Sequence, residues 1–126
     1  MLHRDYIMRL IQLFFEALAK FIRNKEGKDP EILRPELDEL YKNFLKHPRD
    51  FFKDFSVEEI INFFDNDEKL YKIEIVAELF YQDAMLGDPD KELLRKALSL
   101  FRYVDLNSDT FSFDRQRKTG EIEMLL

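Results

Sequence analysis

The stretch Glu68–Leu86 (EKLYKIEIVAELFYQDAML) decides the fold, because it is long, free of glycine and proline, and built largely of residues that favour helices. Its apolar residues recur at helical spacing, and the expected inner stripe comprises Tyr71, Ile75, Val76, Leu79, Phe80 and Met85. Gly87 follows directly, and glycine at that place commonly ends a helix. We therefore predict one long helix from Glu68 to Leu86 with a buried inner face.

Helical patterns also precede this segment. We expect a first helix from about Asp5 to Asn24, in which Phe14, Leu18 and Phe21 belong to a wide apolar stripe that packs on the body of the protein. A second helix is predicted to begin near Arg34-Pro35-Glu36 and to end at His47-Pro48. Residues 50–55 form a short aromatic segment of about one helical turn. Ser56 and Glu59 then have the spacing of a capping box, which opens a short helix.

Two more helices are predicted after Gly87. Asp88 or Asp90 caps the first of them, and residues 107–110 break it. The last begins near residues 111–114 and reaches the terminus. The sequence thus predicts an all-α fold of about six helices in antiparallel hairpins, in a single domain spanning residues 1–126. Its expected core includes Leu37, Leu40, Phe44, Ile75, Leu79, Phe80, Ala97, Leu98 and Phe101.

Residues 68–126 resemble a helical repeat of the tetratricopeptide kind. Small and large residues occupy the positions at which paired helices of such repeats touch, namely Ala77, Phe80 and Ala84, then Ala97, Phe101 and Val104. The predicted helix before Gly87 is longer than the family period allows, and no proline closes the repeat. The resemblance therefore implies a degenerate tetratricopeptide-like repeat in a right-handed array, covering about half of the chain.

Two further segments resemble an uncharacterised bacterial family of short helical proteins, a domain of unknown function. They are Asp5-Tyr6-Ile7-Met8-Arg9, with the Leu/Phe-rich helix after it, and residues 108–115 (SDTFSFDR). That family has no assigned activity. The resemblance implies a helical fold and a bacterial origin, and it implies no catalytic residue.

The charge distribution and the composition limit the classes of partner that we expect. The net charge is −6, yet residues 1–28 sum to +3 and residues 29–126 to −9. An acidic body argues against nucleic acid as a partner, whereas the basic first helix is open to docking on that body or on an anionic membrane. The chain has no cysteine and no apolar run long enough to span a membrane, so we expect a cytoplasmic protein without disulfides.

No residue pattern predicts a catalytic or metal site. The two histidines, His3 and His47, lack the spacing of paired ligands, and the three glycines stand too far apart for a phosphate loop. Asp105, Asn107 and Asp109 have the spacing of the first calcium ligands of an EF-hand, but Thr110 and Gln116 occupy the places of its glycine and its closing glutamate. We interpret these residues as helix-ending and helix-capping groups, and we predict no catalytic residue, cofactor or metal.

The 13 phenylalanines are the unusual feature of the composition. Three adjacent pairs occur, Phe14-Phe15, Phe51-Phe52 and Phe63-Phe64, and neighbouring residues on a helix point about 100° apart. One ring of each pair is thus placed to enter the core and the other to remain at its edge, unless the stripe buries both. We predict a non-catalytic module for protein interaction or assembly, which binds a protein, a peptide or a second copy of itself. Its candidate interaction surface is Phe15, Phe52 and Phe64; the alternative function is peripheral membrane association through the first helix.

Overall fold

The computed structural model describes residues 2–126, with the side chains of residues 5–65 and 67–126. Over that range the chain is helical, in line with the all-α prediction. The elements in order are α1 (Leu2–Asn24), α2 (Pro30–Leu45), α3 (Arg49–Lys53), α4 (Val57–Phe63), the 3-10 turn η1 (Asn66–Glu68), α5 (Lys69–Ala84), α6 (Lys91–Asn107) and α7 (Phe113–Leu125). The predicted aromatic turn is the short helix α3.

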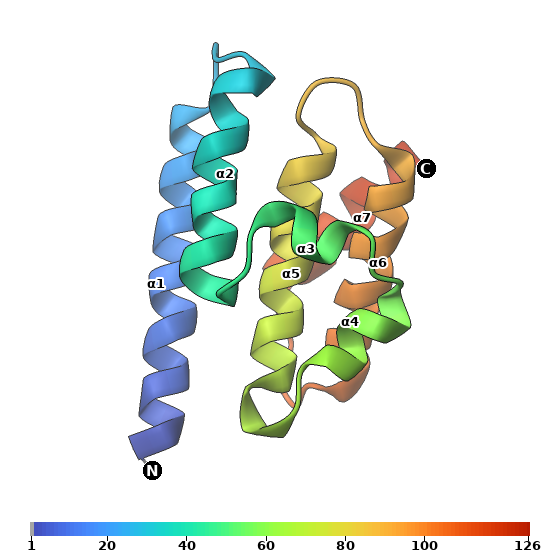
Figure 1. Ribbon diagram of the computed structural model, residues 1–126. Coiled ribbons are helices and arrows are strands. Elements are labelled where there is room, and N and C mark those ends of the chain that lie inside the picture. Colours follow the sequence, from blue (N-terminus) through green and yellow to red (C-terminus); the bar gives the residue numbers. More distant parts are fainter. Residues whose placement is uncertain (1) are drawn as a thin grey trace.

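Helix α5 lies at the centre of the molecule. Helices α1 and α2 flank it on one side and α6 on the other, α3 and α4 cross in front of α5 and α6, and α7 lies behind them (Figure 1). Every residue from Ile73 to Phe80 is buried. We predicted that only one face of this helix is buried. Residues 73–80 are instead buried on every face, because neighbouring helices pack on each side of α5.

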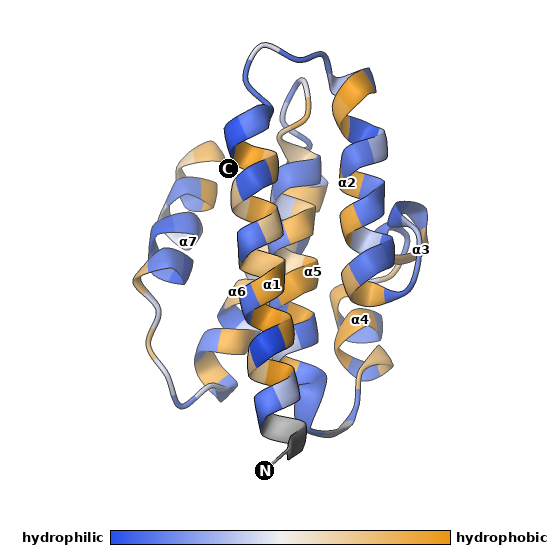
Figure 2. Ribbon diagram, turned by 90° about the vertical axis from the view of Figure 1, so that its left-hand side faces the viewer, coloured by the Kyte–Doolittle hydropathy of each residue, from blue (hydrophilic) through white to orange (hydrophobic). Residues whose placement is uncertain are grey.

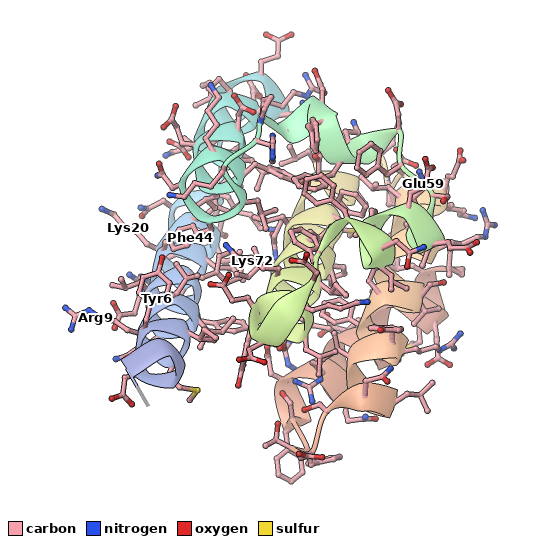
Figure 3. All side chains as sticks on the ribbon, turned by 60° about the horizontal axis from the view of Figure 1, so that its bottom comes forward. Tyr6, Arg9, Lys20, Phe44, Glu59 and Lys72 are labelled. Carbon is pink, nitrogen blue, oxygen red and sulfur yellow. The ribbon has the colours of Figure 1, made fainter. Side chains whose placement is uncertain are left out.

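Helix α1 packs its apolar stripe on the body. Ile7, Phe14, Leu18 and Phe21 are buried, as the spacing predicted for the last three. Arg9 and Lys20 project from the opposite side of the helix, away from the body (Figure 3). This stripe of α1 thus belongs to the core, while Tyr6, Met8, Leu13 and Ile22 of the same helix remain exposed.

Helix α2 begins earlier than the sequence pattern indicated. It starts at Pro30 rather than near Arg34, and Pro35 lies inside it. A proline at the first helical position removes only an N–H that has no partner within the helix, and the Asp29 carbonyl accepts from the N–H groups of Ile32 and Leu33 instead. Pro35 removes one interior bond, which an exposed position near the first turn tolerates.

The segment after α2 is held by specific caps. Lys46 adopts a left-handed conformation, with a φ of 66°, and its N–H donates to the Lys42 carbonyl, so α2 ends there. The predicted capping box is confirmed, since the Glu59 N–H donates to Ser56 Oγ and the Ser56 N–H donates to the Glu59 carboxylate. Lys72 of α5 reaches α2, where its ammonium donates to the Phe44 carbonyl at 3.0 Å (Figure 3).

Helices α6 and α7 begin at capped ends. Asp90 Oδ1 accepts from the Leu93 N–H, and Ser112 Oγ accepts from the Arg115 N–H. Figure 2 shows α1 in front of α5, with α2 on one side and α7 on the other. Helix α7 buries Ile122 together with two charged residues, Arg115 and Lys118.

Of the nine predicted core residues, eight are buried and Phe44 is half-buried at the edge of the core, in ring contact with Phe14 at 5.3 Å.

Within residues 2–126, none of the helices has both the length and the apolar character needed to cross a membrane.

Candidate functional site

The three residues of the predicted interaction surface, Phe15, Phe52 and Phe64, differ in how far the fold buries them. Phe52 has no exposed surface, and it therefore cannot serve as an exposed anchor. Phe15 and Phe64 are half-buried and pack against the core. The ring of Phe15 contacts Phe14 at 5.3 Å and lies 6.0 Å from the Lys118 ammonium, so it helps to seat α7.

Phe52 is buried because α3 and α4 fold against each other into a cluster of rings. His47 stacks on Phe51 at 4.0 Å with nearly parallel planes, and Phe52 meets Phe51 and Phe63 edge to face at 4.9 and 5.6 Å. Edge-to-face pairs at these distances are favourable. Phe63 is the most exposed ring of this group, with 41% of its surface accessible, while His47 and Phe51 are half-buried.

The most exposed aromatic rings lie elsewhere, at Phe111 in the loop between α6 and α7 and at Phe113, the first residue of α7. Phe111 and Phe113 expose 67% and 82% of their surface, and their rings meet edge to face at 4.8 Å. Leu106, near the end of α6, is 85% exposed. The predicted anchors were adjacent phenylalanines, so this pair, separated by Ser112, was not among them. The available signal was the alternation Phe-Ser-Phe in a polar loop, where no helical stripe buries either ring.

A polar cleft of about 560 Å³ lies beside this aromatic pair. It opens between the start of α5, the end of α6 and the first residues of the α6–α7 loop. Carboxylates, hydroxyls and two cations line it, among them Asp67, Lys69, Tyr71, Glu74, Tyr103, Asp109 and Arg115. The α6–α7 loop thus contributes residues 108–110 to the wall of the cleft, and Phe111 follows directly in the chain.

Arg115 fixes the shape of that loop. Its guanidinium donates to Asp105 Oδ1 at 2.7 Å, to Glu74 Oε2 at 3.2 Å and to the Thr110 carbonyl at 2.9 Å. Burial raises the pKa of Glu74, and the positive charge of Arg115 opposes that rise. Because these three acceptors lie on α5, on α6 and in the loop, one side chain holds the wall of the cleft in place.

The residues with EF-hand spacing have other partners. Asp105 accepts from Arg115 and from Gln116, and Asn107 donates to the Tyr103 carbonyl at 2.8 Å. These contacts agree with the interpretation of the segment as the end of one helix and the start of the next. Among the described residues, histidine and acidic side chains nowhere gather in a group of three that could hold a metal ion, and His3 lies outside the described side chains.

Buried polar residues on α5 are a second feature that sequence reasoning missed. Glu74, Glu78, Gln82 and Asp83 are all buried in the central helix. Asp83 accepts from Arg49 at 2.7 Å and from Tyr41 at 3.2 Å, while Glu78 pairs with Lys118. Burial raises the pKa of Glu78 to about 7, against the opposing effect of Lys118. The spacing of Glu74, Glu78 and Gln82 by four residues was the signal, since it places polar groups in line along an otherwise apolar helix.

The fold and this loop define an all-α domain that exposes an aromatic pair next to a polar cleft. Comparisons with models of known families, with curated proteins and with solved structures found no match. The resemblances to tetratricopeptide repeats and to a bacterial family of short helical proteins stay predictions.

Proposed function

We propose that this domain is a non-catalytic protein-interaction module that docks its partner at the α6–α7 loop. One observation carries the proposal: Phe111 and Phe113 hold an edge-to-face geometry while most of each ring faces solvent. Exposing two such rings is unfavourable for an isolated chain, whereas aromatic anchors of this kind supply much of the binding energy of protein interfaces.

The surroundings of the pair suit a protein partner. Arg115 and the Ser112 cap fix the loop on both sides of Phe111, so little conformational entropy is lost when a partner covers the rings. The adjacent cleft supplies charged and hydroxyl groups for a polar rim, which is the usual anatomy of such an interface.

The same proposal includes the finer fold class. The close packing of α5 on α6, with Ala77, Ala84 and Ala97 fully or almost fully buried, supports a degenerate tetratricopeptide-like hairpin. Repeats of that kind present interaction surfaces rather than catalytic groups.

Site-specific photo-crosslinking tests the function. A benzoylphenylalanine at position 111 should form a defined adduct in cells, and the same probe at Ile32, which is 54% exposed on α2, should not. The captured protein, once purified, should bind the wild-type chain and lose affinity about tenfold or more for the double variant Phe111→Ser/Phe113→Ser. An adduct between two copies of this chain would identify the partner as itself.

Both substitutions are at exposed positions, so the variant should keep the wild-type circular dichroism spectrum and melting temperature. Equal affinity of the captured protein for the variant and the wild type would contradict the proposal. So would sedimentation of the chain with vesicles through the same two rings, since that would make the loop a membrane contact.

A further inference from the structure

The opposite end of α5 carries a second concavity that the proposed interaction does not use. A pocket of about 490 Å³ lies between the α1–α2 turn and the α5–α6 turn. Apolar side chains from four elements or turns form much of its wall, among them Ile22, Pro30, Leu33, Met85 and Leu86. Its size falls within the usual range for small-molecule sites, which are mostly apolar with a few polar groups.

Lys25 supplies the main polar group of this pocket. Its side chain is half-buried, and burial lowers the pKa of its ammonium. A lysine just after a helix often turns back to the free carbonyls of the last turn. Lys25 instead crosses to α5, where its ammonium donates to Gln82 Oε1 at 3.1 Å.

The partner of Lys25 is a neutral amide, in contrast to the ion pairs elsewhere in the protein. Lys118 and Arg49 are seated against the carboxylates of Glu78 and Asp83. An ammonium has three N–H donors, and the bond to Gln82 uses one of them. The site thus holds a partly desolvated positive charge, and two of its three donors remain for an anion.

The remaining charges of the pocket leave a net positive site. Lys28 and Glu26 also line it. Lys28 Nζ lies 3.5 Å from the Glu36 carboxylate, with both side chains in contact with solvent, so that ion pair is weak. Glu26 is exposed at the rim, where solvent screens its repulsion of an anion.

The backbone of the α5–α6 turn shapes one wall of this pocket. Gly87 has a φ of 74°, a conformation that side chains other than glycine rarely adopt, and a Cβ at this position would lie 3.7 Å from Pro30 Cγ. The contact with Pro30 would be an ordinary one, so glycine is needed here for its left-handed backbone conformation, which shapes the α5–α6 turn that forms one wall of the pocket. From these observations we propose that the pocket binds a small amphipathic anion, a molecule with a carboxylate or phosphate group held by Lys25 and an apolar body against Leu33, Met85 and Leu86.

Four probes of the native protein test this assignment. Decanoate and decyl phosphate carry both features, decanol has the apolar body without the charge, and acetate has the charge without the body. At concentrations below micelle formation, the two anionic amphiphiles should shift the backbone NMR signals of residues 22–30 and 85–87. Decanol should bind about tenfold more weakly than decanoate, and acetate more weakly still. The ratio of decanoate to decyl phosphate affinity then distinguishes a carboxylate ligand from a phosphate ligand.

Variants locate the charge. Lys25→Gln should weaken decanoate binding about tenfold, Lys25→Arg should retain most of it, and Lys20→Gln, at an exposed position of α1, should leave it unchanged. Equal binding of decanol and decanoate, no binding of either anionic amphiphile, or signal shifts centred on residues 106–113 would each overturn the assignment. The mapping on the wild-type protein decides the question even if Lys25→Gln does not fold.

Discussion

Replacing Glu78 by glutamine should stabilise this protein increasingly as the pH rises. Glu78 is fully buried on α5, and its pKa is raised to about 7 by burial, against the favourable effect of the Lys118 charge. A carboxyl group with a raised native pKa binds its proton more tightly in the folded state than in the unfolded state. Its contribution to stability is therefore fully present below the unfolded pKa of 4.5 and is lost as the pH rises through about 7.

The magnitude follows from the two pKa values. Between pH 5.5 and pH 8, the linkage relation gives a loss of about 2 kcal/mol in the free energy of unfolding from this one group. Glutamine resembles the protonated form of Glu78, so the variant should not show this loss. The difference in unfolding free energy between Glu78→Gln and the wild type should consequently grow by about 2 kcal/mol over the same interval.

Urea denaturation followed by circular dichroism at pH 5.5, 6.5, 7.5 and 8 measures this difference. Glu39→Gln, at an exposed position of α2, is the matched control and should show no such trend. The lowered pKa values of Asp38, Glu59 and Asp114 affect stability only at lower pH, where those carboxylates become protonated. If Glu78→Gln became less stable relative to the wild type as the pH rose, attraction to Lys118 would outweigh desolvation, and the reasoning would be refuted.

Four further results are expected. Phe80→Ala should lower the free energy of unfolding by about 3–5 kcal/mol in the same denaturation assay, because this ring is fully buried on the central helix. Arg49→Met should cost about 3–5 kcal/mol, since it removes the ion pair from a buried Asp83, and adding Asp83→Asn should recover much of that loss. Millimolar calcium should leave the melting temperature unchanged, because Asp105 is engaged by Arg115; an increase that Asp105→Ala abolishes would contradict this. Deleting residues 1–26 should leave an insoluble or molten remainder, because it removes Phe14, Leu18 and Phe21 from the core, and a soluble variant with cooperative melting would speak against that.

Local sequence signals determined the elements of this fold. The capping box at Ser56 and the cap of α6 by one of two aspartates, which proves to be Asp90, were predicted because each depends on residues three positions apart. The cap at Ser112 has the same spacing but was not among the predictions. The start of α2 was misplaced because both Pro30 and Pro35 are acceptable near a helix start, and local preference alone does not choose between them.

Which aromatic rings are exposed was decided by the tertiary structure. Adjacent phenylalanines look alike in sequence, yet Phe52 is fully buried and Phe63 is 41% exposed, because α3 and α4 fold over one ring and leave the other at the edge. Likewise, Phe111 and Phe113 became a candidate site only because the fold leaves both of these rings largely exposed.

For the polar residues of α5, too, the sequence determines the spacing and the tertiary structure determines burial and partners. The sequence by itself fixed how many acidic groups the chain has and that Glu74, Glu78 and Gln82 share one side of a helix. Only the packing of α7 and α1 against α5 decided that these groups are buried and that Arg115, Lys118 and Lys25 meet them. Helical periodicity is a local property of the backbone. Burial and pairing instead depend on which segments, distant in sequence, pack against the helix, and the folding of the whole chain determines that.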